Sequence, residues 1–287
     1  MKKRAVIANS TGSLDYLDIK NENLRLWRMK ILLEDKSYTD FTEITAEYFY
    51  GQLEENKNLV PSSSMPSPGE LHLILEELEE KGYEEAIIIT LSSGLSGTFN
   101  SVSIALNAYE GNIKIHVIDS RNAAISEGFL SLEALRLIDE GVETKDIVQY
   151  IEKLRTHRKQ YFMVDNLRLF VKNGRLSGAS GFVGSMFKIK PILEVNETGH
   201  IVSFKKIRTQ KRALKEMVEL VIEDLQSIEN FVVTYNTSNN LEGLKYVMDR
   251  MEEAFPGYKY YDAPITPVIG CHTGVGTVGI AYFDLDL

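Results

Sequence analysis

Three short runs rich in apolar residues dominate the first half of the chain. They cover residues 5–8, 86–91 and 113–118, and each of them ends in a polar loop. Runs of this kind, rich in isoleucine and valine, are typical of parallel strands that are covered on both faces. The segments between and after them predict helices at about 98–109, 122–140 and 144–157.

Another helix is predicted directly after residue 66. Ser67 occupies an N-cap position, Pro68 the first helical position, and Glu70 follows the cap by three residues, which together form a capping box. Leucines then repeat along one face until Lys81 and Gly82 end the helix. Strand and helix therefore alternate through the first half, as in a doubly wound, mostly parallel sheet.

The pattern changes after about residue 158. Apolar runs at 191–195 and 201–204 flank Asn196-Glu197-Thr198-Gly199, an arrangement that predicts an antiparallel hairpin. Further elements are expected in alternation, with helices at 209–227 and 239–253 and strands at 230–235, 258–262 and 278–283. We therefore expect two domains: a doubly wound α/β domain at 1–158, and an α+β domain with a mixed or antiparallel sheet at 159–287.

Composition and charge narrow the function. The chain has 287 residues, of which 25% are charged and 44% hydrophobic, as is ordinary for a folded globular protein. Its 32 basic and 41 acidic side chains give a net charge of −9, which disfavours nucleic acid and anionic membrane surfaces as partners. An anionic ligand must therefore be held by a local set of donors.

Cysteine and histidine usage excludes other chemistry. Cys271 is the only cysteine, so the chain can form no internal disulfide and lacks the thiolates of a structural zinc site. The histidines share no ligand spacing, so we expect no metal and no cofactor. The N-terminal apolar run is shorter than a signal peptide core, and no run reaches the roughly 18 residues of a membrane span. We expect a cytoplasmic, monomeric protein without membrane insertion.

Residues 92–98 are the first candidate for a binding site. This loop lies between a buried strand and a helix, and ligands of open α/β sheets bind beyond the carboxyl ends of strands. Its glycines free the backbone, and the hydroxyls of Ser93, Ser96 and Thr98 can donate to an anion. Alternatively, Ser96 only caps the next helix. The loop has no lysine, which disfavours a nucleoside triphosphate.

Other polar segments also have more than one interpretation. Three serines at 62–64 lie between prolines and form either an ordinary linker or a set of hydroxyl donors. His272 lies in a glycine-flanked segment that we expect to be extended, with Cys271 pointing to the opposite face as core filling. Ser96 and His272 would suit a serine hydrolase, although no acidic third member is evident. Apolar residues at 181–193 fit either a core or a ligand tunnel.

Five segments of the chain form a pattern when they are taken together. They are Asn9-Ser10-Thr11, Ser63-Ser64-Met65-Pro66-Ser67, the loop 92–98, Asn173-Gly174-Arg175 and the segment 272–276. In this order they resemble the motifs of the DegV family, the bacterial fatty-acid-binding proteins also called FakB: Asp-Ser-Thr, Thr-Ser-x-Pro-Ser, Ser-Ser-x-Leu-Ser-Gly-Thr, Gly-Gly-Arg and His-x-Gly-x-Gly. The resemblance runs nearly from end to end.

The resemblance implies a lipid-binding carrier rather than an enzyme. Such a carrier holds one long-chain fatty acid between two domains, while a separate fatty acid kinase phosphorylates the carboxylate transiently presented to it. The acyl phosphate then passes to phospholipid synthesis. A DegV-type protein that works without a kinase, as a lipid store or sensor, is the alternative.

The resemblance also implies roles for individual residues. Ser63 and Ser96 are expected to contact the carboxylate directly. Arg175 is expected to face the kinase or to support the polar network. The rest of that network is expected from Ser64, Ser93, His272 and Arg208.

Three positions depart from the family motifs. Asn9 replaces an aspartate and removes a charge, Ser63 replaces a threonine and keeps its hydroxyl, and Asn173 replaces the first glycine of the turn. Asparagine tolerates left-handed backbone, so we expect the turn to be kept. Because both hydroxyl loops are present, we expect lipid binding.

Overall fold

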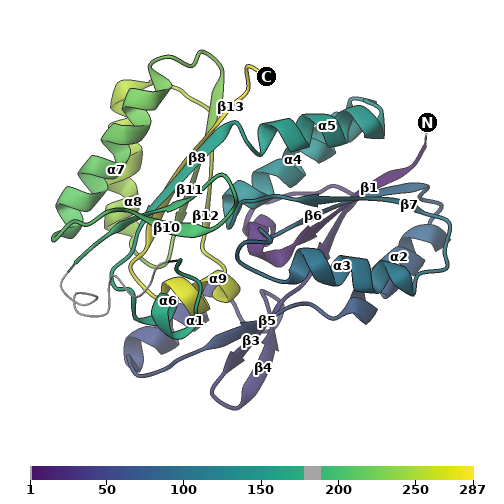
Figure 1. Cartoon of the computed structure of the whole chain (residues 1–287), viewed down its shortest axis with the longest axis horizontal. Helices are drawn as coiled ribbons and strands as arrows, with labels where there is room; N and C mark the ends of the chain where they lie inside the picture. The colour runs from purple at the N-terminus through teal and green to yellow at the C-terminus, as the bar shows by residue number, and fades with distance from the viewer. Residues whose placement is uncertain (1, 178–188) are drawn as a thin grey trace.

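A four-stranded parallel sheet organises the first half of the chain (Figure 1). The computed structural model describes residues 2–177 and 189–287. The strand order is β2-β1-β6-β7, from β1 (Arg4–Asn9), β2 (Leu24–Trp27), β6 (Glu85–Thr90) and β7 (Lys114–Asp119). The predicted strands β1, β6 and β7 are confirmed. Strand β2 was not predicted, because a strand of four residues that includes the charged Arg25 has too weak a hydrophobic pattern.

Helices cover both faces of this sheet because both faces of its strands are apolar. On one face Ala5, Ile7 and Ile88 pack against α2 (Pro68–Glu80) and α3 (Thr98–Asn107). On the other face Val6 and Ile87 pack against α4 (Ile125–Asp139) and α5 (Thr144–Leu154). Successive residues of a strand point to opposite faces, so the continuous apolar runs of the sequence serve two layers. The predicted doubly wound arrangement is confirmed.

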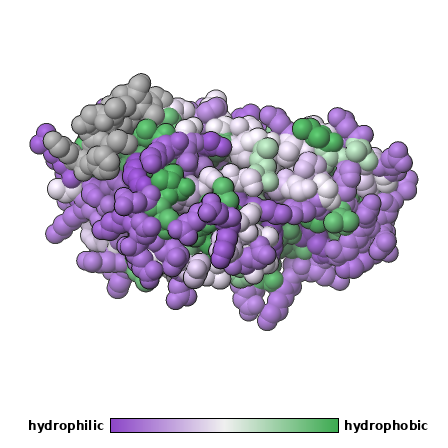
Figure 2. Space-filling model, turned by 90° about the horizontal axis from the view of Figure 1, so that it is seen from below, coloured by the Kyte–Doolittle hydropathy of each residue, from purple (hydrophilic) through white to green (hydrophobic). Residues whose placement is uncertain are grey.

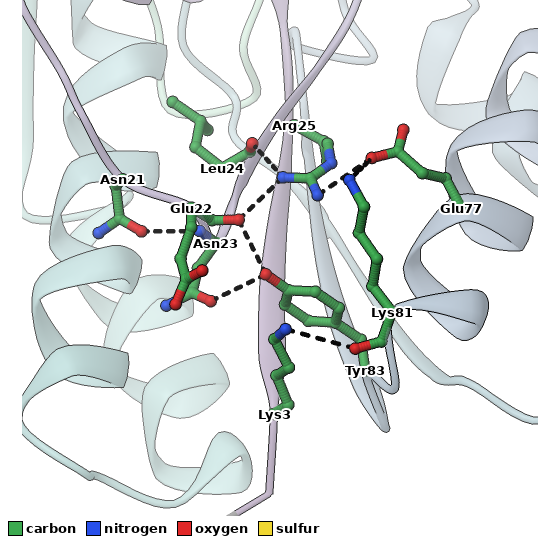
Figure 3. A network of polar contacts seen from close by, with 9 residues as sticks. All are labelled: Lys3, Asn21, Glu22, Asn23, Leu24, Arg25, Glu77, Lys81 and Tyr83. Atoms are coloured by element: carbon green, nitrogen blue, oxygen red, sulfur yellow. Dashed lines mark hydrogen bonds and ion pairs between the residues drawn. The ribbon is translucent and has the colours of Figure 1, made fainter.

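Polar contacts hold the amino-terminal edge of this sheet together (Figure 3). The Tyr83 hydroxyl donates to the Glu22 carbonyl at 2.8 Å, and the Lys3 ammonium lies 4.4 Å from the centre of the Tyr83 ring. Lys3 also donates to the carbonyl of Lys81, the residue that follows α2.

The capping box at the start of α2 is confirmed. The Ser67 hydroxyl accepts from the Gly69 amide, and the Glu70 carboxylate accepts from the Ser67 amide. At the opposite edge of the parallel sheet, where its strands end, the chain continues into loops.

A six-stranded mixed sheet organises the second half of the chain. Its strand order is β10-β9-β8-β13-β11-β12, from β8 (Arg158–Met163), β9 (Ile192–Val195), β10 (Ile201–Lys205), β11 (Phe231–Thr237), β12 (Tyr260–Pro264) and β13 (Val278–Asp284). The predicted hairpin is confirmed as β9 and β10, and only the pair β11 and β12 is parallel. The outer face carries Tyr161, Val233 and Ile280 against α7 (Gln210–Leu225) and α8 (Leu241–Ala254).

The inner face of the mixed sheet contacts two different helices. Phe162 and Leu193 pack towards α6 (Arg168–Lys172), while Phe283 contacts Phe129 of α4 with ring centres 4.7 Å apart. Because α4 also packs on the parallel sheet, it is buried between the two sheets. The middle of the inner face, around Gly279, is left for a cavity.

A third, smaller sheet corrects two expectations from the sequence. Its order is β4-β3-β5, from β3 (Lys30–Leu33), β4 (Lys36–Thr39) and β5 (Ser62–Ser64), and it projects from the lower edge of the molecule (Figure 1). The linker interpretation of residues 60–66 is therefore wrong, since β5 pairs with β3. The segment before Gly274 is not extended but forms the helix α9 (Pro267–Thr273), which packs against α1 (Ala46–Glu55), β3 and β5.

Two short helical turns follow the first strand of the parallel sheet. They are the 3-10 turns η1 (Ser10–Gly12) and η2 (Leu14–Tyr16). The face seen from below is largely hydrophilic with scattered apolar groups (Figure 2). Of the helices in the described part of the chain, none is long and apolar enough to cross a bilayer.

Candidate functional site

A cavity of about 380 Å³ lies between the inner face of the mixed sheet, α9, β5 and the loops that follow β6 and β7. This volume is within the usual range of small-molecule sites. Most of its wall is apolar, with side chains contributed by Met29, Leu91, Leu95, Ala123, Ala124, Phe162, Phe170, Val195, Ile201, Ile265, Val268 and Ile269. An elongated apolar ligand can be buried here.

Ser63 and His272 form the polar centre of the cavity wall. Ser63 lies on β5 and His272 on α9, and the serine Oγ is 2.9 Å from the histidine Nε2. Burial, together with the positive charge of Arg175, lowers the pKa of His272 to about 4. The imidazole is therefore neutral at pH 7 and can serve as a hydrogen-bond donor or acceptor, but not as a counter-charge.

Ser64, Ser96 and Arg175 line the same cavity. The Ser96 hydroxyl is 2.8 Å from the Thr98 hydroxyl and accepts from the amide of Thr98, the first residue of α3, while Gly97 is the N-cap residue. Arg175 is exposed and donates to the carbonyls of Leu95 and Asn173. Hydroxyl donors and one guanidinium thus gather where the cavity approaches the surface, as suits the binding of a carboxylate.

Asn173 joins three segments of the site. Its amide donates to the carbonyl of Cys271 at 2.8 Å and to that of Pro61 at 3.3 Å, which ties α6 to α9 and to the residue before β5. The expected turn at 173–175 is present, but its left-handed residue is Gly174 with a φ of 67°, whereas Asn173 has a φ of −92°. An asparagine here therefore positions the neighbours of Ser63 and His272.

The structure does not bring Ser93 or Arg208 to this cavity. The Ser93 hydroxyl donates to Asp119 at 2.6 Å, because Ser93 points back over the end of β7. Arg208 is exposed in a separate depression lined also by Lys205 and Arg212, at the start of α7. The order of the motifs in the sequence could not distinguish Ser93 and Arg208 from the other candidates, because the direction in which a side chain points depends on the folded loop.

Asn9, the uncharged replacement in the first motif, is also outside the cavity wall. Its amide donates to the Trp27 carbonyl, and its side-chain oxygen accepts from the Leu91 amide at 3.1 Å. An aspartate could make only the second of these bonds. Asn9 thus fastens the carboxyl ends of β2 and β6 to β1, and it places no charge in the polar end of the cavity.

The geometry offers no support for the serine hydrolase alternative. Ser96 bonds to Thr98 rather than to His272, and Nδ1 of His272 is buried without a hydrogen bond to any residue of 2–177 or 189–287. A triad needs a carboxylate at that nitrogen. Cys271 is fully buried, as expected for core filling, and burial raises the pKa of its thiol well above the usual range. Across the same two ranges, no cluster of three possible metal ligands occurs.

Several residues of the cavity wall escaped the sequence analysis. Gln160 on β8 and Asn236 on β11 are each 4% exposed and line the cavity, and α9 adds the apolar Ile269. Thr266 and Pro267 have the helix-start pattern that could have revealed α9. Of the expected tunnel segment, 181–188 lies outside the described residues, while Ile192 is buried in the core.

The fold and the cavity together define an α/β protein with a largely apolar internal cavity that is lined by hydroxyl groups around Ser63 and Ser96. The chain belongs to the DegV family: the family model, described as "Uncharacterised protein, DegV family", matches residues 3–285. A DegV domain-containing protein of Staphylococcus aureus is 32% identical over 98% of this chain and 97% of its own length. A Listeria monocytogenes relative is 34% identical over 98% of both chains.

Solved structures agree with this assignment. The Bacillus subtilis protein described as "DegV, a fatty acid binding protein" has a TM-score of 0.89 at 32% identity, covering 99% of this chain and all of that one. A fatty acid binding DegV family protein of Streptococcus agalactiae has a TM-score of 0.90 at 27% identity, covering 99% of both. The Streptococcus pneumoniae fatty acid kinase B3 protein loaded with linoleic acid shares the fold, with a TM-score of 0.84 at 22% identity and coverage of 98% and 99%.

Proposed function

We propose that this chain binds one long-chain fatty acid in the cavity, with the carboxylate at the end lined by Ser63, Ser96 and His272. The observation that carries the proposal is the division of the wall: hydroxyls and a neutral imidazole around Ser63 and His272, and mostly aliphatic and aromatic side chains along the rest. The Bacillus and Streptococcus agalactiae relatives, described as fatty acid binding, support the same ligand class.

Apolar burial accounts for most of the expected affinity. A chain of about 16 carbons buried at roughly 0.8 kcal/mol per methylene contributes on the order of 12 kcal/mol before ordering costs. Hydroxyl donors add orientation, since each neutral hydrogen bond exchanges for one with water and contributes only about 1 kcal/mol net. The acyl chain thus retains the ligand, and the serines direct its carboxylate.

We further propose that the bound carboxylate is presented to a separate fatty acid kinase in the cytoplasm, and that the carrier then delivers the acyl phosphate to phospholipid synthesis. The exposed positions of Ser64 and Arg175 support access from outside. Neutral donors leave carboxylate lone pairs available to attack the γ-phosphate of ATP, with ADP as the leaving group. In this proposal the kinase supplies the catalytic groups, and the exposed Arg175 is the residue of the carrier that contacts the kinase.

Replacing Ser96 with alanine tests the proposed orientation. The Ser96→Ala variant is expected to lose about tenfold in kinase-dependent phosphorylation of its bound lipid while retaining the lipid within about twofold, because one hydroxyl contributes little to affinity. The measurement is acyl phosphate formation with purified kinase and ATP, alongside mass spectrometry of the bound lipid.

Ser93→Ala is the matched control, since Ser93 belongs to the same loop but bonds to Asp119 outside the cavity wall. It is expected to behave like the unaltered protein. Equal losses of phosphorylation and lipid in Ser96→Ala would contradict the orientation. Tight lipid binding without phosphorylation of any variant would instead favour a lipid store or sensor.

A further inference from the structure

The inner wall of the cavity contains two buried side-chain amides that the binding of a plain fatty acid does not use. Gln160 on β8 and Asn236 on β11 lie on the same face of the mixed sheet, on either side of β13. Each is 4% exposed, in contrast to the exposed Ser64 and Arg175 at the other end. The amides therefore lie deep in the cavity wall, where the acyl chain would run.

In the side-chain amide of Gln160 the nitrogen donates a hydrogen bond, whereas the oxygen accepts none from the described residues. Its Nε2 donates to the carbonyl of Ala123 at 2.9 Å, which fixes the orientation of the group, because a flipped amide would place two oxygens together. The opposite atom, Oε1, is buried and accepts no hydrogen bond from the described residues. It is an acceptor without a partner, on a residue of the cavity wall.

Asn236, on the other side of β13, is the second amide of the cavity wall. Among residues 2–177 and 189–287 its side-chain amide forms no hydrogen bond, and it leans over Gly279, where an added Cβ would lie 2.4 Å from its oxygen. Thr234, two residues earlier on the same face, is by contrast paired with Ser126 at 2.9 Å. The unpaired amides are thus confined to the part of this face that lines the cavity.

We propose that the acyl chain this cavity prefers carries a hydroxyl group remote from the carboxylate, which donates to Gln160 or bonds to the Asn236 amide. This inference rests on the proposed fatty-acid function and specifies its ligand as a hydroxy fatty acid. Burying a polar group without a partner is unfavourable, so a fully apolar chain laid over these amides loses affinity that a hydroxylated chain recovers.

The test compares stearate with 10- and 12-hydroxystearate as competitors of a fluorescent fatty acid bound to the full chain. At least one hydroxystearate is expected to bind about tenfold more tightly than stearate, the effect of one recovered hydrogen bond. The near-isosteric Gln160→Met and the Asn236→Leu variants are expected to reduce or reverse this preference. Thr234→Val is the matched control on the same sheet face and is expected to keep it.

The outcomes separate the two proposals. If stearate binds at least as tightly as both hydroxystearates to the unaltered protein, the preference for a hydroxylated chain is overturned, while the fatty-acid function stands. If none of the three lipids binds, the fatty-acid function itself fails. The comparison on the unaltered protein decides the question even if a variant does not fold.

Discussion

The Ala123→Phe variant is expected to lose at least about a hundredfold in fatty acid affinity. Ala123 follows β7, is 7% exposed and lines the cavity, so a phenyl ring added there occupies space meant for the acyl chain. Excluding even four methylenes removes roughly 3 kcal/mol of burial, which corresponds to about two orders of magnitude in the dissociation constant. Titration with a fluorescent fatty acid measures the change.

The same substitution at Ala254 provides the control. Ala254 is the exposed last residue of α8, which packs on the outer face of the mixed sheet and not on the cavity side, and Ala254→Phe is expected to bind normally. Circular dichroism and the thermal midpoint establish that Ala123→Phe is folded. A folded Ala123→Phe protein with unchanged affinity would show that the acyl chain does not occupy this cavity.

The Asp40→Asn variant is expected to be more stable than the unaltered protein above pH 7, by about 3 kcal/mol. Asp40 is fully buried, and burial raises the pKa of its carboxyl to about 7, with only partial relief from the Ser10 hydroxyl and from Arg28. At pH 8 the folded chain must therefore hold a buried negative charge. Asparagine keeps the shape of the side chain and removes that charge.

The sign of the pH dependence follows from the same shift. Because the folded pKa lies above the unfolded value of 3.8, the favourable contribution of protonated Asp40 is complete below about pH 4 and is lost as the pH rises through about 7. Urea unfolding at pH 4.5 and pH 8 measures this loss. The stability gain of Asp40→Asn should be small at pH 4.5 and large at pH 8, and equal gains at both would contradict the assignment.

Elements with continuous or periodic apolar patterns could be predicted from the sequence. The parallel strands β1 and β6 are buried on both faces, so their central residues, 5–8 and 86–89, are all apolar. The α2 cap and the β9–β10 hairpin depend on local chemistry at Ser67 and around Gly199, which a sequence displays directly. In these cases the local preference and the tertiary packing agree.

Elements defined by distant partners could not be predicted in this way. Three serines form β5 because β3 supplies backbone hydrogen-bond partners some thirty residues earlier in the chain, and serine itself has no strand pattern. The residues Gln160 and Asn236 line the same cavity only because β13, near the C-terminus, lies between β8 and β11 in the sheet. Motif order placed Ser63, Ser96 and His272 at one cavity, but it could not show that Ser93 turns to Asp119 and Arg208 to another surface.

The central claim is that this cavity holds a fatty acid, and the most direct test is denaturing mass spectrometry of lipid released from the purified protein. The proposed function predicts about one free fatty acid per chain, released without covalent attachment, and its absence from the Ala123→Phe variant. A protein that carries no lipid and takes up none when fatty acid is supplied would contradict the claim. So would an acyl group bonded covalently to Ser96, which would indicate hydrolase chemistry instead.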